Sequence, residues 1–243
     1  MRYTLTVGSL AAALLATAGC NQPPAPVTPP DPTADAGPDP TDDQPQQTSL
    51  FVDDRVAELR VEMAAADWAA MLADPEAEAW YPGAVVYDET RVEQVMVRVK
   101  GNSSLHSVAD TGSHRFSFKV DLDDVVADQQ LFGASKLILN NGFKDPTLVR
   151  EALAYGVARA AGLPASRTAF VDLWVADEHL GVYTLVEDVG GDFLDGNFDD
   201  GNGILYKPEP PAGDLSWRGA TFANYPGLEV ERHEELGHDA FLA

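Results

Sequence analysis

The sequence predicts an α+β fold in which a mostly antiparallel sheet packs against one dominant helix. Three observations predict it. Residues 91–100 and 115–122 alternate apolar and polar side chains with the two-residue period of a strand. Residues 145–161 carry apolar side chains at helical spacing. Residues 167–175 and 180–187 flank a short loop, as the two strands of a β-hairpin do.

The other elements follow from short apolar runs between polar turns. A short helix is expected over 64–74, and a loop rich in Gly and Ser over 101–114. The remaining strands are expected at 56–63, 84–89, 135–140 and 203–209. The chain shows no internal repeat, so these elements belong to a single fold and not to a solenoid.

The dominant helix has clear end signals. Asp145 suits the N-cap, Pro146 suits the first helical position, and Gly162 stops the helix. One face is apolar: Val149, Leu153, Gly156, Val157 and Ala160. The opposite face carries Glu151 among small and aromatic residues, with no cation three or four positions away. Because a buried carboxylate needs compensation, its partner is expected elsewhere in the chain.

Lys119 is the expected partner. It lies in the middle of a strand and faces away from Phe116 and Phe118. A solvated sheet face would explain a lysine there, but a cleft would also explain the lone carboxylate on the helix. A strand lysine paired with a helix glutamate is how protein kinases hold nucleotide phosphates. We therefore expect a Lys119–Glu151 ion pair, direct or bridged by one water.

The N-terminus indicates export. Residues 1–19 form a signal peptide whose apolar stretch is too short to span a bilayer. Cys20 follows Ala18 and Gly19, as in a bacterial lipobox, although Thr17 stands where Leu is usual. We expect lipidation of Cys20 and an extracytoplasmic, membrane-anchored protein. A plain secretory signal with an incidental cysteine is the alternative.

Residues 20–49 are rich in Pro and Asp and contain no aromatic residue, so they form an extended tether. The folded domain spans 50–243. The chain holds 39 acidic and 16 basic residues, a net charge of −23. This charge excludes nucleic acid, and an anionic membrane surface, as partners of the folded part. The single cysteine excludes a disulfide within the chain.

Several segments together resemble one family. They are "VRVKGNSS" (97–104), "FSFKVDL" (116–122), the run from "LILNN" to "DLWV" (137–175), "GVYTLVEDV" (181–189) and "ILYKPE" (204–209). In this order and spacing they resemble the CotH family of bacterial spore-coat-type proteins, regarded as atypical protein kinases. The resemblance covers roughly 50–225. It implies an atypical kinase-like N-lobe and the start of a C-lobe, with the second lobe incomplete.

The resemblance also implies a nucleotide site and a substrate class. The cofactor would be ATP with Mg²⁺ or Mn²⁺, and the substrate a secreted or surface protein. Lys119 would bind phosphate, Glu151 would be its helix partner, and Glu187 would lie near the hinge beside adenine. Gly101, in the loop after a strand, and Lys207 are weaker carry-overs. The five cofactor-binding candidates are thus Lys119, Glu151, Glu187, Gly101 and Lys207.

The departures from the family concern catalysis. The catalytic and metal-binding aspartates of the family have no counterpart here, so we expect no catalytic residue, no metal ligand and an inactive, incomplete domain. The alternatives are a non-catalytic surface-binding or coat-assembly module and a calcium-dependent adhesion domain. "DGNFDDGNG" (195–203) and "HEELGH" (233–238) resemble a calcium loop and a zinc helix, but both lack required ligand positions.

Overall fold

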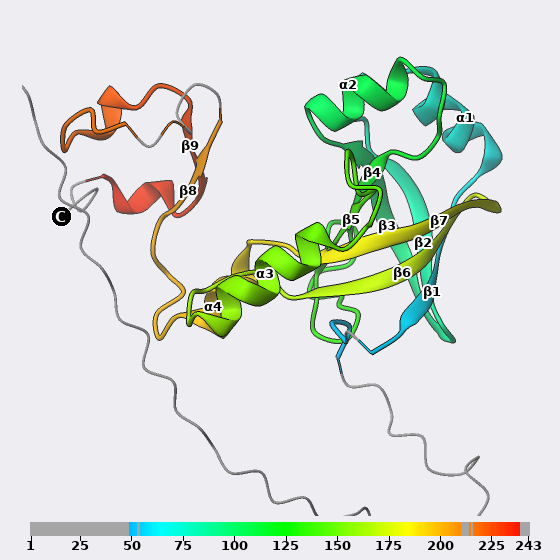
Figure 1. Ribbon diagram of the computed structural model, residues 1–243, viewed down its shortest axis with the longest axis horizontal. Coiled ribbons are helices and arrows are strands. Elements are labelled where there is room, and N and C mark those ends of the chain that lie inside the picture. The colour runs from blue at the N-terminus through cyan, green and yellow to red at the C-terminus, as the bar shows by residue number, and fades with distance from the viewer. Residues whose placement is uncertain (1–48, 53, 210–213, 215, 239–243) are drawn as a thin grey trace, which may run out of the picture. The chain divides into compact units, whose positions relative to one another are not determined.

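The structure is a computed structural model, and it describes residues 49–52, 54–209, 214 and 216–238 (Figure 1). The chain divides into two units, 1–45 and 46–243, and the fold below belongs to the second. The predicted signal peptide, Cys20 and tether residues 21–48 lie outside the described residues. Among the described helices, none has the length and hydrophobicity that a membrane span requires.

Seven strands close into a barrel, and this closure was not predicted. Their order around the barrel is β1-β2-β3-β4-β5-β7-β6. All neighbouring pairs are antiparallel except β1 and β6, which run parallel. The strands are β1 (Val56–Glu62), β2 (Tyr81–Tyr87), β3 (Thr90–Lys100), β4 (Ser117–Asp121), β5 (Lys136–Asn140), β6 (Thr168–Val175) and β7 (Glu178–Glu187). The predicted α+β class is confirmed.

The predicted alternation of side chains fills the barrel. Val97, Val99, Phe118 and Val120 point inward and are at most 1% exposed. Because neighbours along a strand point to opposite faces, the polar residues between them point outward. Lys119 therefore lies on the outer face of the barrel, as the sequence predicted.

Within the described residues, four α-helices accompany the barrel: α1 (Ala65–Ala73), α2 (Ser103–Ala109), α3 (Arg150–Ala160) and α4 (Gly191–Asn197). Helix α1 lies where the sequence predicted it. Helix α2 lies within the segment expected to be a loop, and its Leu105 is buried in the core. A single dominant helix is not confirmed, since α1 has nine residues and α3 has eleven.

Helix α3 begins at Arg150, so the predicted start at Asp145 is wrong. Lys144 and Leu148 have positive φ angles of 56° and 60°, which interrupt a helix. Asp145 nevertheless caps the helix from a distance, because its carboxylate accepts a 2.8 Å hydrogen bond from the Arg150 backbone N–H. A second bond of 3.0 Å comes from the Thr147 backbone N–H. The segment before α3 is therefore an ordered turn.

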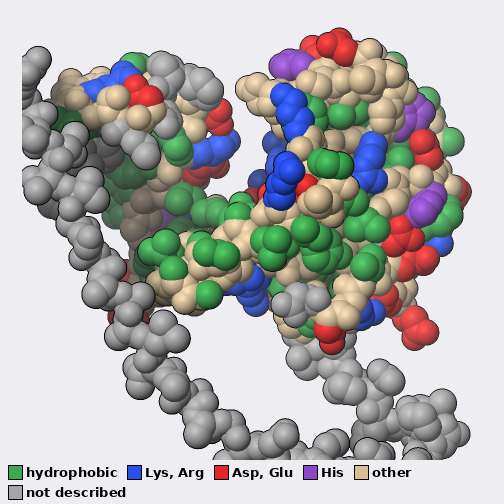
Figure 2. Space-filling model, viewed as in Figure 1, with side chains coloured by type: hydrophobic (Ala, Val, Ile, Leu, Met, Phe, Trp, Pro, Cys, Tyr) green, Lys and Arg blue, Asp and Glu red, His purple; other side chains and the backbone are tan. Residues whose placement is uncertain are grey.

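The two faces of α3 are arranged unexpectedly. Its apolar stripe points to solvent, with Leu153 61% and Val157 69% exposed. Figure 2 shows hydrophobic side chains over the visible face of this helix. Glu151 and Tyr155 lie on the opposite face and are half-buried. The face that carries the lone carboxylate is thus the one turned inward.

A two-stranded sheet follows α4. Strand β8 (Leu205–Pro208) pairs antiparallel with β9 (Leu228–Arg232), and β9 was not predicted. Short 3-10 turns occupy Pro75–Ala77, Phe222–Asn224 and Glu234–Leu236. β8 and β9 both contribute to the site described next.

Candidate anion-binding site

Four cations lie on the outer face of β3, β4 and β5: Arg98, Lys100, Lys119 and Lys136. In the strand register, Arg98 is opposite Lys119 and Lys100 is opposite Ser117. Lys100 and Lys119 are therefore diagonal neighbours on adjacent strands. Like charges this close repel one another. In a chain with a net charge of −23, this local gathering of positive charge favours an anion.

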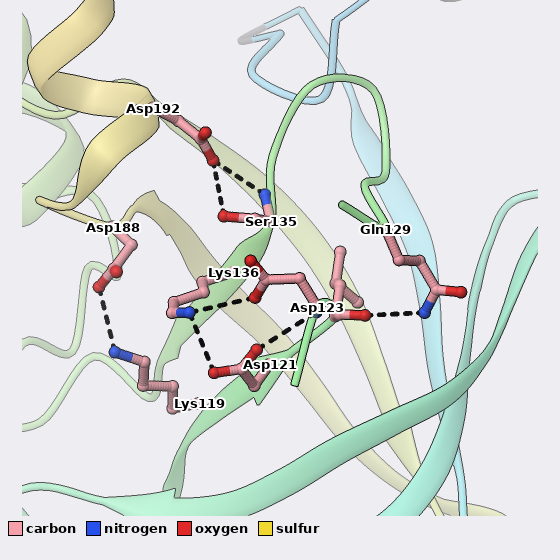
Figure 3. Close-up of polar contacts among 9 residues, drawn as sticks. Lys119, Asp121, Asp123, Gln129, Ser135, Lys136, Asp188 and Asp192 are labelled. Carbon is pink, nitrogen blue, oxygen red and sulfur yellow. Dashed lines mark hydrogen bonds and ion pairs between the residues drawn. The ribbon is translucent and has the colours of Figure 1, made fainter. Parts of the chain in front are cut away.

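Three of these cations are already compensated. Arg98 pairs with Glu78. Lys136 lies 3.1 Å from an Asp121 oxygen and 3.2 Å from an Asp123 oxygen (Figure 3). Although burial lowers the pKa of Lys136, its hydrogen bonds to these two carboxylates raise that pKa overall. The positive charge of Lys136 is therefore compensated by these two carboxylates.

Lys119 contacts Asp188, the residue just after β7. Its Nζ lies 3.5 Å from Asp188 Oδ1 (Figure 3). The two side chains are 23% and 26% exposed. The pair is long and partly open to solvent, so an anionic ligand can compete with Asp188 for the ammonium group.

Lys100 has a neutral partner. Its Nζ donates a 3.1 Å hydrogen bond to Asn140 Oδ1 at the end of β5. Of the four cations, and within the described residues, Lys100 is the one that makes no ion pair. Burial lowers the pKa of Lys100, Glu151 and Asp188 oppose that shift, and Lys119 adds to it. A half-buried ammonium without a direct counter-ion is costly, which points to a binding role.

Glu151 is reached through the same amide. Asn140 Nδ2 donates a 2.7 Å hydrogen bond to Glu151 Oε1, so Asn140 bridges Lys100 and Glu151. Burial raises the pKa of Glu151, while the Asn140 bond and the Lys100 charge lower it. The cation associated with Glu151 is thus Lys100.

The expected direct ion pair between Lys119 and Glu151 is not among the ion pairs of the described residues. The reason is positional. Lys119 extends toward the end of β7, whereas Glu151 packs against the end of β5. Lys100 lies on the same face as Lys119 but on the neighbouring strand, two residues beyond Arg98, the residue opposite Lys119.

Glu187 ends β7 and is tightly bound. Its carboxylate is 7% exposed and lies 2.6 Å from Arg167 Nη2. It also accepts bonds from Arg167 Nε at 3.0 Å and from the Arg167 backbone N–H at 2.9 Å. The carboxylate of Glu187 therefore holds β7 to the start of β6.

A cleft of about 550 Å³ lies over this face of the barrel. Arg98, Lys100 and Lys119 line one part of it, and β8 and β9 contribute to its wall. The carboxylates of Glu187, Asp188 and Glu231 also border the cleft, and its apolar and aromatic wall consists of Ile138, Tyr155, Val186, Val189, Leu205 and Tyr206. An apolar surface beside several cations suits a ligand with a flat ring and an anionic group.

The sequence-predicted residues divide between this cleft and an adjoining hollow. Lys119, Glu187 and Lys207 line the cleft. Gly101 and Glu151 line a hollow of about 560 Å³, and Lys100 and Asn140 line both spaces. Figure 2 shows Lys and Arg side chains beside the space between α2 and α3. All five residues therefore border one continuous region around Lys100 and Asn140.

Two of them have a clear local role. Gly101 has a φ of 130°, and a Cβ there would lie 2.6 Å from Ser104 Oγ, so glycine is needed for the turn into α2. Lys207 pairs with Glu209 at 2.8 Å and with Glu231 at 3.5 Å. Its pKa is raised, mainly by the hydrogen bond to Glu209.

Sequence reasoning missed Lys100, Asn140, Asp188 and Arg167. For Lys100 a signal existed, since the alternation of 91–100 places it on the same face as Arg98, next to the strand of Lys119. Asn140 and Asp188 end strands, where periodicity says nothing about partners. Among the described residues, no three Asp, Glu, His or Cys side chains gather as a metal site would require.

The fold is a closed barrel whose outer face carries a cluster of cations that border a cleft. The family described as CotH kinase protein matches the chain over residues 97–241, which is more than half of its length. The chain therefore belongs to the CotH kinase protein family, as its motifs indicated. Membership in this kinase-like family suggests the use of a nucleotide and a metal in general. No curated protein matches the chain.

The half-buried carboxylate of Glu151 should lower the stability of the folded domain when it is charged. Because the pKa of Glu151 is raised in the folded state, its charged form destabilises the fold at pH 7. Glu151→Gln should therefore raise the free energy of unfolding at pH 7. The difference in unfolding free energy between the variant and wild type should narrow as the pH falls toward the pKa of Glu151 in the unfolded chain, because the wild-type carboxyl then becomes neutral as well. Urea unfolding at pH 7 and at pH 4.5, the ordinary pKa of a glutamate carboxyl, measures this difference in stability. A difference that is constant or wider at pH 4.5 would contradict the assignment.

Proposed function

We propose that this chain is a CotH-type domain that binds a nucleoside triphosphate in the cleft over β3, β4 and β5. Lys100 and Lys119 would hold the phosphates, and the apolar wall that includes Ile138, Val186 and Tyr206 would hold the base. The observation that carries the proposal is Lys100, a half-buried ammonium bound to a neutral amide beside a second ammonium. Family membership supports the same ligand class.

The cofactor suggested by the family is ATP with Mg²⁺ or Mn²⁺. The phosphates fit the residues present, since a triphosphate would supply the counter-ion that Lys100 lacks. For the metal, the described residues bring together no group of three His, Cys, Asp or Glu side chains that could hold it. A divalent ion bound with ATP would neutralise charge on the phosphates when present.

The test uses residues 46–243, which form their own unit and contain every core residue named above. ATP binding is measured by calorimetry at two salt concentrations, with inorganic tripolyphosphate and adenosine as competitors. We expect ATP binding that weakens with salt, displacement by tripolyphosphate, and much weaker binding of adenosine. Equal binding of adenosine and ATP would refute the role given to the lysines.

We further propose that the described residues bind phosphate without transferring it. The three carboxylates that line the cleft are engaged: Glu187 with Arg167, Asp188 with Lys119, and Glu231 with Lys207. Transfer needs a carboxylate that orients the acceptor hydroxyl. Residues 46–243 with labelled ATP, Mg²⁺ or Mn²⁺ and a generic acidic protein should give no labelled protein. Incorporation of label would assign the chain to the active protein kinases that act on secreted or surface proteins.

The location of the protein is also proposed from its sequence. We expect the thiol of Cys20 to be lipidated and to anchor the domain outside the cytoplasm. Cys20→Ser in the full chain, expressed in a bacterial host, should move the protein from the membrane fraction to the soluble extracytoplasmic fraction, because the acyl chains supply the membrane affinity. Fractionation and immunoblotting measure this. Unchanged membrane association in the variant would exclude the lipobox.

A further inference from the structure

The amide of Asn140 has a forced orientation. The Lys100 ammonium can only donate hydrogen bonds, and the Glu151 carboxylate can only accept them. Oδ1 of Asn140 must therefore face Lys100, at 3.1 Å, and Nδ2 must face Glu151, at 2.7 Å. A side chain with one acceptor and one donor is what this position needs.

The same sheet shows what a carboxylate does to a neighbouring lysine. Lys136 is held directly by Asp121 and Asp123, and its pKa is raised. Lys100 is held by an amide, and its pKa is lowered, first by burial. The two lysines lie on the same face of the barrel, on strands β5 and β3. Their partners, and not their strands, distinguish them.

We propose that Asn140 is a positioning residue whose neutral amide separates the Lys100 ammonium from the Glu151 carboxylate and so keeps the ammonium available to an anionic ligand. The identity of that ligand rests on the proposed function, whereas the geometry of the amide does not. A carboxylate at position 140 would pair with Lys100 directly and would compete with a phosphate for it.

The test transfers the negative charge from position 151 to position 140. Asn140→Asp combined with Glu151→Gln keeps the net charge and the pair of hydrogen-bonding groups, but places the carboxylate against Lys100. We expect the affinity for inorganic tripolyphosphate to fall about tenfold in the double variant. Glu151→Gln alone, which leaves Asn140 in place, separates the loss of the Glu151 charge from the effect of the new carboxylate at position 140, so the double variant should bind more weakly than this single variant. Thermal unfolding of each variant verifies that it is folded. Affinity of the folded double variant equal to wild type would overturn the proposal.

A second readout needs no phosphate ligand. The rate at which a trace of acetic anhydride labels Lys100 is followed by mass spectrometry of the peptide. The other charges that act on Lys100, those of Arg98, Lys119 and Asp188, are the same in both proteins. Labelling should slow several-fold in the double variant, because an adjacent carboxylate raises the pKa of the amine.

The two readouts separate the two proposals. Slower labelling of Lys100 together with no tripolyphosphate binding by wild type would refute the proposed function and leave the role of Asn140 standing. Unchanged labelling in the folded double variant would overturn the role of Asn140, whatever wild type binds.

Discussion

Lys100→Ala should weaken ATP binding by about 30-fold, equivalent to about 2 kcal/mol for a charge-assisted hydrogen bond in a partly buried site. Stability should not fall with it. Lys100 is half-buried without a direct counter-ion, so its removal relieves a desolvation cost while it removes one hydrogen bond to Asn140. Calorimetry with ATP and thermal unfolding measure the two effects on the same preparations.

Lys136→Ala is the matched control for this prediction. It removes a lysine from the same face of the barrel, but one that two carboxylates already hold and that lies outside the cleft. We expect near-normal ATP affinity and a lower melting temperature, because Asp121 and Asp123 lose their shared cation. Equal losses of ATP affinity in both variants would show that only the general positive potential of the face matters, and not Lys100 in particular.

Arg167→Ala should destabilise the domain by about 3 kcal/mol, because it leaves the buried carboxylate of Glu187 without its cation. Urea unfolding measures the loss. Arg167→Ala combined with Glu187→Gln should recover part of it, since the side chain that remains at position 187 is then neutral.

Arg91→Ala provides the surface comparison for Arg167. Arg91 pairs with Glu62 and Glu93, and the three side chains are between 42% and 63% exposed. Its loss should change the stability little, because exposed ion pairs contribute little. If Arg167→Ala is as mild as Arg91→Ala, Glu187 is not the buried anchor between β6 and β7 that the structure indicates.

The sequence predicted the faces of the barrel strands because a period of two is a local property. Val97 and Phe118 point inward, and Lys119 points outward, as expected. The closure of the barrel could not be predicted in the same way. It depends on the parallel pairing of β1 with β6, which joins Val56 to Phe170 across more than half of the folded unit. Such long-range pairings leave no periodic pattern in either strand.

The helices show a second limit. The predicted start of α3 at Asp145 rested on a capping signal that is real, since Asp145 bonds to the Arg150 backbone N–H. Leu148, which lies between them, has a left-handed conformation that the sequence does not reveal, so the helix begins only after it. The apolar stripe of α3 is also exposed, whereas the amphipathic pattern alone would have placed it against the core.

For the site, the sequence pointed to Glu151 and Lys119 but not to Lys100, the cation that Asn140 links to Glu151. Glu151 does face inward, and Lys119 does lie on the adjoining sheet face. The choice between Lys100 and Lys119 as the cation nearest Glu151 depends on where α3 meets the end of β5. That position is fixed by the contact of Asn140 with Glu151, a hydrogen bond between side chains eleven residues apart.

The most direct test of the phosphate site is a crystal structure of residues 46–243 with a non-hydrolysable ATP analogue and Mg²⁺. The account predicts phosphate oxygens within hydrogen-bonding distance of both Lys100 and Lys119, with the base against the apolar wall of the cleft. Lys100 should keep its contact with Asn140 while it binds the phosphate. An analogue bound elsewhere, with Lys100 touching only Asn140 and Lys119 still paired with Asp188, would contradict the account.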